Sequence, residues 1–138
     1  KRQVATVDAA GKVTVKGPGV AKITVKAAAT TDYKAASKTV TVTVAPKKQS
    51  ISLVNKIKKQ LTIKWKKNTK ASGYQVVYST NKKFTGKKTV RKAKTTTSYK
   101  IKGLKKGKKY YVKVRSYKTV NGKRIYGAYS TAKKATIK

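Results

Sequence analysis

The chain offers few side chains that could carry out acid–base, nucleophilic or metal chemistry. It has no His, no Cys and only two acids, Asp8 and Asp32. General acid–base catalysis near neutral pH relies on His or on paired carboxylates. Calcium sites need several oxygen ligands, and zinc sites need Cys or His. We therefore expect no catalytic residue, no metal site and no cofactor, and we expect Asp8 to hydrogen-bond its own backbone in a turn.

One nucleophilic spacing is present, because S-x-x-K occurs at Ser79–Lys82 and at Ser130–Lys133. A Lys at this distance can activate a Ser in serine acyl-enzymes. Both occurrences are expected by chance in a chain with eight Ser and this much Lys, and the helix that carries the motif in those enzymes is absent from the pattern. We predict that the chain is not an enzyme, which leaves open whether a larger parent protein is one.

The charge of the chain is almost entirely of one sign. Lys and Arg number 38 against two acids, for a formal net charge of +36. A chain with this charge repels itself and favours an anionic partner. Only Arg2, Arg91, Arg115 and Arg124 can make the planar, bidentate contacts that distinguish Arg from the point charge of Lys. The Lys-rich composition therefore predicts diffuse attraction to an anionic polymer.

The elements that must position these cations are β-strands. Residues 40–44 and 111–114 alternate apolar and polar side chains, which is typical of strands, and Asn121-Gly122 is a hairpin signal. The Ala-rich residues 26–37 are expected to form a loop between strands. No apolar run approaches the ~20 residues of a membrane span, so we expect no membrane insertion. Many short strands at this spacing predict an all-β chain of antiparallel immunoglobulin-like sandwiches in tandem.

Residues 46–50 are predicted to be a linker, because Pro46 cannot donate a hydrogen bond to a strand ladder. The module that follows, residues 51–138, is predicted to have seven strands, near 51–54, 61–66, 73–79, 87–92, 97–102, 108–118 and 125–137. Its motifs are Leu61-Thr-Ile63-Lys-Trp65, then Gly73-Tyr74-Gln-Val76-Val-Tyr78, then Leu104-x-x-Gly107-x-x-Tyr110-x-Val112-x-Val114.

This series resembles a fibronectin type III domain over its whole length. The resemblance implies that Trp65 is the core tryptophan of the second strand. It also implies that Tyr110 is the tyrosine corner of the family, whose hydroxyl bonds to the backbone of the preceding loop.

Residues 1–45 carry a second resemblance. Val4-Ala-Thr-Val7-Asp8, Gly17-Pro-Gly19 and Val40-Thr-Val42-Thr-Val44 are similar to the C-terminal half of a bacterial immunoglobulin-like domain of group 2. Only four strands are covered, and so short a segment cannot enclose a sandwich core. We expect this partial domain either to be truncated or to be completed by strands from upstream residues or from another chain.

Cations decorate the outward positions of the second module. On strand 108–118, Tyr110, Val112 and Val114 are predicted to face inward, which turns Lys113 and Arg115 outward. Tyr111, Tyr117, Tyr126 and Tyr129 are expected to stack on sugars or bases where they are exposed, although the two on the last strand are favoured to pack at the edge of the core. The residues predicted to bind the polyanion are Lys64, Lys66, Lys100, Lys102, Lys105, Lys106, Lys108, Lys109, Lys113, Arg115, Lys118, Lys123 and Arg124.

These observations predict a non-catalytic module that binds anionic polymers by diffuse electrostatics and anchors or spaces a larger parent protein. Lys-rich pairs of these two domains resemble repeats in secreted proteins of low-GC Gram-positive bacteria. This implies a secreted or cell-surface location, with cell-wall teichoic acid or host polyanions as partners. Three alternatives stay open: a nonspecific nucleic-acid-binding protein, a passive spacer domain, and a strand-exchanging filament subunit.

Overall fold

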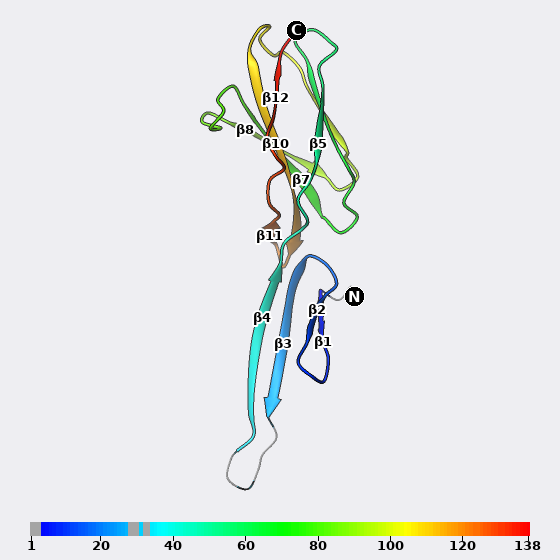
Figure 1. Ribbon diagram of the computed structural model, residues 1–138, viewed down its shortest axis with the longest axis vertical. Coiled ribbons are helices and arrows are strands. Elements are labelled where there is room, and N and C mark those ends of the chain that lie inside the picture. The colour runs from blue at the N-terminus through cyan, green and yellow to red at the C-terminus, as the bar shows by residue number, and fades with distance from the viewer. Residues whose placement is uncertain (1–3, 28–30, 32–33) are drawn as a thin grey trace. The chain divides into compact units, whose positions relative to one another are not determined.

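The computed structural model describes residues 4–27, 31 and 34–138 (Figure 1). The chain divides into two compact units, Lys1–Val44 and Ala45–Lys138. Every element in the described residues is a strand, and every strand pair is antiparallel, so the all-β prediction is confirmed. Accordingly, no helix in this part of the chain is long and apolar enough to cross a membrane.

In its described residues, unit 1 contains two hairpins (Figure 1). The short hairpin pairs β1 (Ala5–Val7) with β2 (Val13–Val15), and the long hairpin pairs β3 (Gly19–Ala27) with β4 (Ala36–Val44). The long strands extend into both ends of the segment 26–37, which the sequence predicted to be a loop. Strand pairing continues to Ala27 opposite Ala36, and the alternating Thr and Val residues of β4 favour the extended conformation.

The turn of the short hairpin is built around Asp8. Its Oδ1 accepts hydrogen bonds from the backbone N–H groups of Ala10 at 3.0 Å and Lys12 at 2.9 Å. Gly11 follows at φ +83°, a conformation that residues with a Cβ rarely adopt. The predicted role of Asp8 is therefore confirmed, whereas Asp32 lies outside the described residues.

Unit 1 leaves apolar side chains in water. Val7, Val13, Val15, Val25 and Val40 are each between 43% and 59% exposed. Two-stranded hairpins bury little surface by themselves and are marginal in water. As the sequence led us to expect, the described strands of unit 1 do not enclose a core.

Unit 2 is described throughout and has eight strands in two sheets. The smaller sheet has the order β5–β6–β9, made of β5 (Ile51–Val54), β6 (Leu61–Trp65) and β9 (Ser98–Ile101). The larger sheet has the order β11–β10–β7–β8 with β12 also paired to β10, and comprises β7 (Gly73–Ser79), β8 (Lys88–Ala93), β10 (Lys109–Val120), β11 (Lys123–Tyr126) and β12 (Lys133–Thr136).

One strand prediction was wrong, because residues 125–137 form two strands instead of one. Tyr126 of β11 lies opposite Tyr117, and Lys133 of β12 lies opposite Val112. Six residues, 127–132, thus face four residues of β10, 113–116. The extra length forms a bulge that interrupts the ladder and divides the strand.

Ser130 holds this bulge against β10. Its backbone N–H donates to the carbonyl of Val114 at 2.7 Å, and its Oγ accepts from the N–H of Val114 at 3.0 Å. The serine side chain replaces the backbone acceptor that a regular ladder would supply. By contrast, the predicted hairpin turn at Asn121-Gly122 is confirmed, since both residues have positive φ, +49° and +75°, as a type I′ turn requires.

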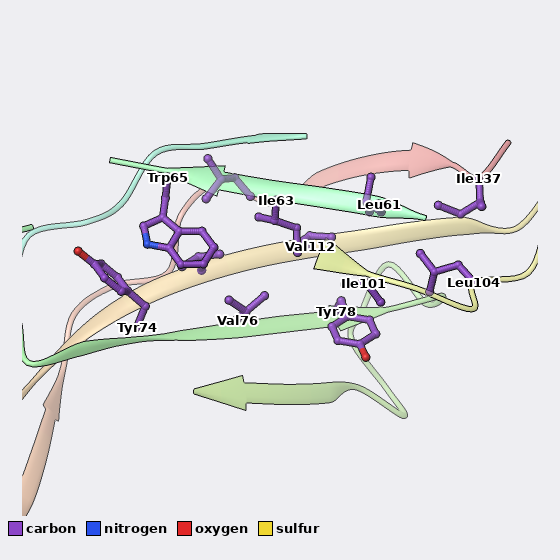
Figure 2. Close-up of a cluster of buried hydrophobic side chains, with 12 residues drawn as sticks. Leu61, Ile63, Trp65, Tyr74, Val76, Tyr78, Ile101, Leu104, Val112 and Ile137 are labelled. Carbon is purple, nitrogen blue, oxygen red and sulfur yellow. The ribbon is translucent and has the colours of Figure 1, made fainter. Parts of the chain in front are cut away.

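The core lies between the two sheets of unit 2 (Figure 2). Trp65 is 5% exposed and packs on Tyr74, with ring centroids 5.4 Å apart. Strand β7 is buried at every position, so it is covered on both faces. The buried cluster comprises Ile51, Leu61, Ile63, Trp65, Tyr74, Val76, Tyr78, Ile101, Leu104, Val112, Val114 and Ile137.

The segment before β5 is packed against this sandwich. Pro46 and Gln49 are buried, and the amide of Gln49 donates to Ser116 Oγ at 3.4 Å. That hydroxyl donates in turn to the carbonyl of Lys47 at 3.3 Å. A Cβ at Gly127 would collide with the carbonyl oxygen of Pro46. These contacts fasten residues 46–50, the predicted linker, to unit 2.

Candidate functional site

The outward face of the larger sheet carries aromatic and cationic side chains in alternation. Val112 and Val114 of β10 are fully buried on the core side, so Lys113 and Arg115 project from the opposite side. Their neighbour Val77 on β7 also faces outward, yet it has no exposed surface. The side chains above Val77 therefore form a second packed layer, in which the stems of long cations can cover apolar surface.

Lys113 lies between two aromatic rings. Its Nζ is 4.2 Å from the ring centroid of Phe84 and 4.3 Å from that of Tyr129. The negative face of an aromatic ring attracts a cation, by about 0.5–1 kcal/mol at exposed sites and about 2 kcal/mol when water is excluded. Two such rings stabilise the ammonium group of the half-buried Lys113 without any carboxylate.

The loop between β7 and β8 brings Phe84 to this position. The Oγ of Ser79 donates to the carbonyl of Thr85 at 2.7 Å and accepts from the N–H of Asn81 at 3.0 Å. The Asn81 side chain accepts in turn from the N–H of Lys83 at 2.7 Å. Phe84 itself has φ +60°, which costs a bulky residue about 1–3 kcal/mol. The hydrogen-bonded loop thus holds the phenyl ring in a strained backbone conformation.

Arg115 is held more tightly than Lys113. Its Nε donates to Oε1 of the buried Gln75 at 2.6 Å, and the same oxygen accepts from the hydroxyl of Tyr129 at 3.1 Å. The guanidinium carbon lies 3.8 Å from the ring centroid of Tyr126 and 4.4 Å from that of Tyr129. One hydrogen bond and two rings together fix the position of the guanidinium.

The alternation continues to the β10–β11 hairpin. Tyr117 and Tyr126 meet edge-on at 5.8 Å, and the guanidinium of Arg124 lies 5.6 Å from the Tyr117 ring centroid. We call this set the aromatic–cation row; its members are Phe84, Lys113, Tyr129, Arg115, Tyr126, Tyr117 and Arg124. Unit 2 contains no Asp or Glu side chain, so its cations have no acidic side chain within the unit to pair with.

The predicted polyanion-binding residues fall into separate groups. Lys113, Arg115 and Lys118 are half-buried, and the other ten are exposed. Lys64 and Lys100 lie on the outward face of the smaller sheet, on the opposite side of the core from the row. The loop between β9 and β10 supplies exposed cations at the end of the sandwich, namely Lys102, Lys105, Lys106 and Lys108, with Lys109 at the start of β10. The structure therefore does not gather the thirteen residues into one patch.

The tyrosines predicted to stack on a ligand are all half-buried. Tyr117 and Tyr126 contact each other, and both lie beneath cations of the same chain. Tyr111 is half-buried in the strand next to Ser79. Part of the ring surface that a base or sugar would need is thus already in contact with protein.

Tyr110 packs against the core, and its hydroxyl makes no hydrogen bond with the residues that the structure describes. The tyrosine hydroxyl that does bond to a loop backbone is that of Tyr74, which accepts from the N–H of Asn68 at 2.7 Å. Trp65 lies in the core, but its Nε1 is buried without a partner. Burial raises the pKa of Tyr78 above its usual 10.0, and the nearby phenols of Tyr99 and Tyr110 raise it further.

The residues that could have served as nucleophiles have structural roles. Ser79 holds the loop before β8, and Ser130 holds the bulge on β10. Across the described part of the chain, no three His, Cys, Asp or Glu side chains cluster to hold a metal ion.

Two members of the site were missed from the sequence: Gln75 and Phe84. Gln75 sits between apolar neighbours in Tyr74-Gln-Val76, so its polarity marks an outward position that needs a partner on the next strand. Phe84 is the only Phe in the chain and is surrounded by polar loop residues. A single large aromatic residue in a polar loop is the signal that could have predicted the packing of Phe84 against the sheet.

Comparison with known proteins gives two family matches. Residues 44–132 match the model described as Fibronectin type III domain, and residues 1–30 match the model described as Intimin, immunoglobulin-like domain. No curated protein matches the chain. Both resemblances proposed from the motifs are thus confirmed, with the intimin type of immunoglobulin-like domain at the N-terminus.

Several solved structures have the same fold. A computationally redesigned β-sandwich protein is 14% identical with a TM-score of 0.55, covering 65% of this chain and 93% of that chain. The fn3 domain of human contactin 1 is 15% identical with a TM-score of 0.55, covering 64% and 73%. The chicken CNTN1 FN1-FN3 domains are 18% identical with a TM-score of 0.56, covering 92% and 47%. At these identities the likeness shows the fold alone.

Fibronectin type III domains are in general non-catalytic scaffold modules, and together with immunoglobulin-like domains of the intimin type they are typical of extracellular surface or adhesion proteins. The family model covers 44–132, which is well over half of the sequence. The chain therefore belongs to the fibronectin type III family, with an immunoglobulin-like segment preceding that domain.

Proposed function

We propose that the chain is a non-catalytic module that binds anionic polymers of the extracellular surface by diffuse electrostatics and so retains or spaces a larger protein there. The observation that carries this proposal is the lack of counter-charge. Thirty of the 38 cations lie in residues 45–138, and neither Asp does. A surface of one sign attracts a polyanion chiefly by releasing the counterions condensed on it.

The distribution of the cations supports a diffuse mechanism. Both sheets and the loops between them carry exposed Lys, so the attraction acts from several sides. Teichoic acid of Gram-positive cell walls is the polymer we favour, because its repeated phosphates offer dense negative charge to Lys side chains without a shaped pocket. The favoured location is accordingly the wall or surface of a Gram-positive bacterium.

The test is co-sedimentation with purified Gram-positive walls, with and without chemical removal of teichoic acid, across a salt series. We expect binding that weakens steeply with salt and disappears with the teichoic acid. Retention that is unchanged at ~1 M salt, where charges are screened beyond ~3 Å, would contradict the electrostatic mechanism.

Duplex DNA titrated under the same salts distinguishes a nonspecific nucleic-acid-binding protein. We expect DNA to bind more weakly than wall polymer at equal phosphate concentration. Equal affinity would instead favour a general polyanion binder, and no binding to either polymer near physiological salt would favour a passive spacer.

A second candidate function follows from unit 1. Its exposed Val7, Val13, Val15, Val25 and Val40 lie on hairpins that enclose no core in the described residues. We propose that strands from outside this sequence, from upstream residues or from another chain, complete this unit, since unpaired edges accept additional strands. Sedimentation at increasing protein concentration tests the version that uses another chain: growth of the particle supports a strand-exchanging filament subunit, and a constant monomer contradicts it.

A further inference from the structure

Among the described Arg side chains, Arg115 alone combines a side-chain hydrogen bond with contacts to two aromatic rings. Its Nε donates a hydrogen bond to the buried Gln75, and its guanidinium lies near two tyrosine rings, those of Tyr126 and Tyr129. Long cationic side chains normally lose about 1.5–2 kcal/mol of rotamer entropy when they are immobilised. For Arg115 this rotamer entropy is already lost on folding, so it is not lost again when a ligand binds.

The outer edge of this guanidinium is formed by its two Nη groups. No hydrogen bond joins either Nη group to the residues that the structure describes. The only fully buried side-chain polar atoms left without a partner in that part of the chain are Asn55 Oδ1 and Trp65 Nε1, so the Nη groups reach solvent. Two parallel N–H bonds from such a fork match two oxygens of one anion.

We propose that Arg115 is a discrete oxyanion-binding site, in which its two Nη groups take two oxygens of one phosphodiester of the bound polymer. This inference rests on the proposed function and adds to it a single oriented contact. Lys113, two residues along the same face of β10, is about 7 Å away along the strand and supplies a second charge for the polymer backbone.

The rings favour a phosphodiester polymer without bases. Sequence-tolerant binding of single-stranded nucleic acid uses open aromatic faces on which bases stack. Here Tyr126 and Tyr129 each lie against the Arg115 guanidinium, and Tyr129 and Phe84 lie against Lys113. These rings contact the chain's own cations instead of offering open faces to bases. We therefore infer a polymer that has no bases, a polyol phosphate.

The first experiment compares two charge-preserving variants, Arg115→Lys and Arg91→Lys. Arg91 lies opposite Gln75 on β8, is exposed and has no ring contact, so it is the matched control. The probe is a short poly(glycerol phosphate), titrated by calorimetry at one fixed salt concentration. We expect affinity to fall about tenfold for Arg115→Lys, the loss of one charge-assisted hydrogen bond, and less than twofold for Arg91→Lys.

A second pair of variants tests the same site with the guanidinium retained. Gln75→Glu places a carboxylate on Arg115 Nε and neutralises the site, while keeping the side chain's length and its contact with the guanidinium. Thr89→Glu, at an exposed position of β8, makes the same change in net charge elsewhere on this sheet. We expect Gln75→Glu to weaken binding several-fold more than Thr89→Glu, which keeps the proposal testable if Arg115→Lys does not fold.

NMR of the Arg side chains reads the contact directly, because the chain has only four Arg. We expect the Arg115 side-chain resonances to shift on addition of the oligomer more than those of Arg91. If wild type binds the oligomer but Arg115→Lys and Gln75→Glu each bind it with the same affinity as their control variants, the discrete site is wrong while the proposed function stands. If wild type does not bind at all, both are wrong. If single-stranded DNA binds as tightly and depends equally on Arg115, the preference for a polyol phosphate is wrong.

Discussion

At the scale of the residue, the larger sheet shows how cations can be half-buried in a unit that has no acidic side chain. Lys113 and Arg115 are half-buried, and their partners are aromatic rings and one amide oxygen. A carboxylate in the same place would neutralise them, whereas ring quadrupoles leave the full charge available. The neutral partners therefore stabilise the fold and keep the face attractive to anions.

Tyr78 provides a test of the core at high pH. Its pKa is raised in the folded state, whereas the unfolded phenol titrates near 10.0. Below pH 10 both states hold the proton, and as pH rises through the folded pKa the unfolded state has already lost it, so the free energy of unfolding falls. We expect wild type to lose stability relative to Tyr78→Phe as the pH rises above 10.

The measurement is chemical denaturation of both variants at each pH, because Lys deprotonation changes the stability of both in the same way. Tyr111→Phe, which removes a phenol outside the core, is the control. A difference between wild type and Tyr78→Phe that stays constant as the pH rises would show that burial of Tyr78 does not hold its proton.

At the scale of the element, the strands of unit 2 could be predicted from sequence because their apolar residues alternate and their turns carry Gly or Asn-Gly. The exception is 125–137, where Gly127 and Ser130 give no sign of the two extra residues that divide the strand. The aromatic–cation row was not predicted as a unit, since it depends on loop residue Phe84 and bulge residue Tyr129 folding over β10. Outward positions on β10 were assigned correctly, but their burial arises from segments distant in sequence.

The contact between Gly127 and the segment before β5 predicts a position intolerant of any side chain. Gly127→Ala would drive a Cβ into the carbonyl of Pro46, which is backbone and cannot rotate away. Overpacking of this kind costs about 1–3 kcal/mol. We expect urea denaturation of Gly127→Ala to show a loss of that size, and Ser50→Ala, at an exposed position of the same segment, to match wild type. Equal midpoints for all three proteins would mean that residues 46–50 can move off the sandwich freely.

At the scale of the whole molecule, charge repulsion opposes folding. The formal net charge of +36 is spread over 138 residues, and the described cations have almost no acids to offset them. Repulsion among exposed charges falls with ionic strength, because the Debye length decreases from about 30 Å at ~0.01 M to about 3 Å at ~1 M salt. The stability of the protein should therefore depend on its ionic surroundings more than that of a balanced domain.

Added salt is accordingly expected to raise the thermal midpoint. Each kcal/mol of repulsion removed should shift the midpoint of a domain the size of residues 45–138 by about 4–8 °C. Circular dichroism melts in sodium chloride from ~0.01 M upward measure the shift. Sucrose at matched osmolality is the control for general solute exclusion. A midpoint that is flat or falls with salt would show that the surface charges do not destabilise the fold.

The burial of Trp65 gives the molecule an internal optical reporter. It is the only tryptophan of the chain and lies beside Tyr74 in the core of residues 45–138. Its fluorescence should shift to longer wavelength only when that sandwich opens to water, whatever happens in residues 1–44. Recording emission and far-ultraviolet dichroism on one sample would therefore separate the melting of the sandwich from the loss of the two valine-rich hairpins.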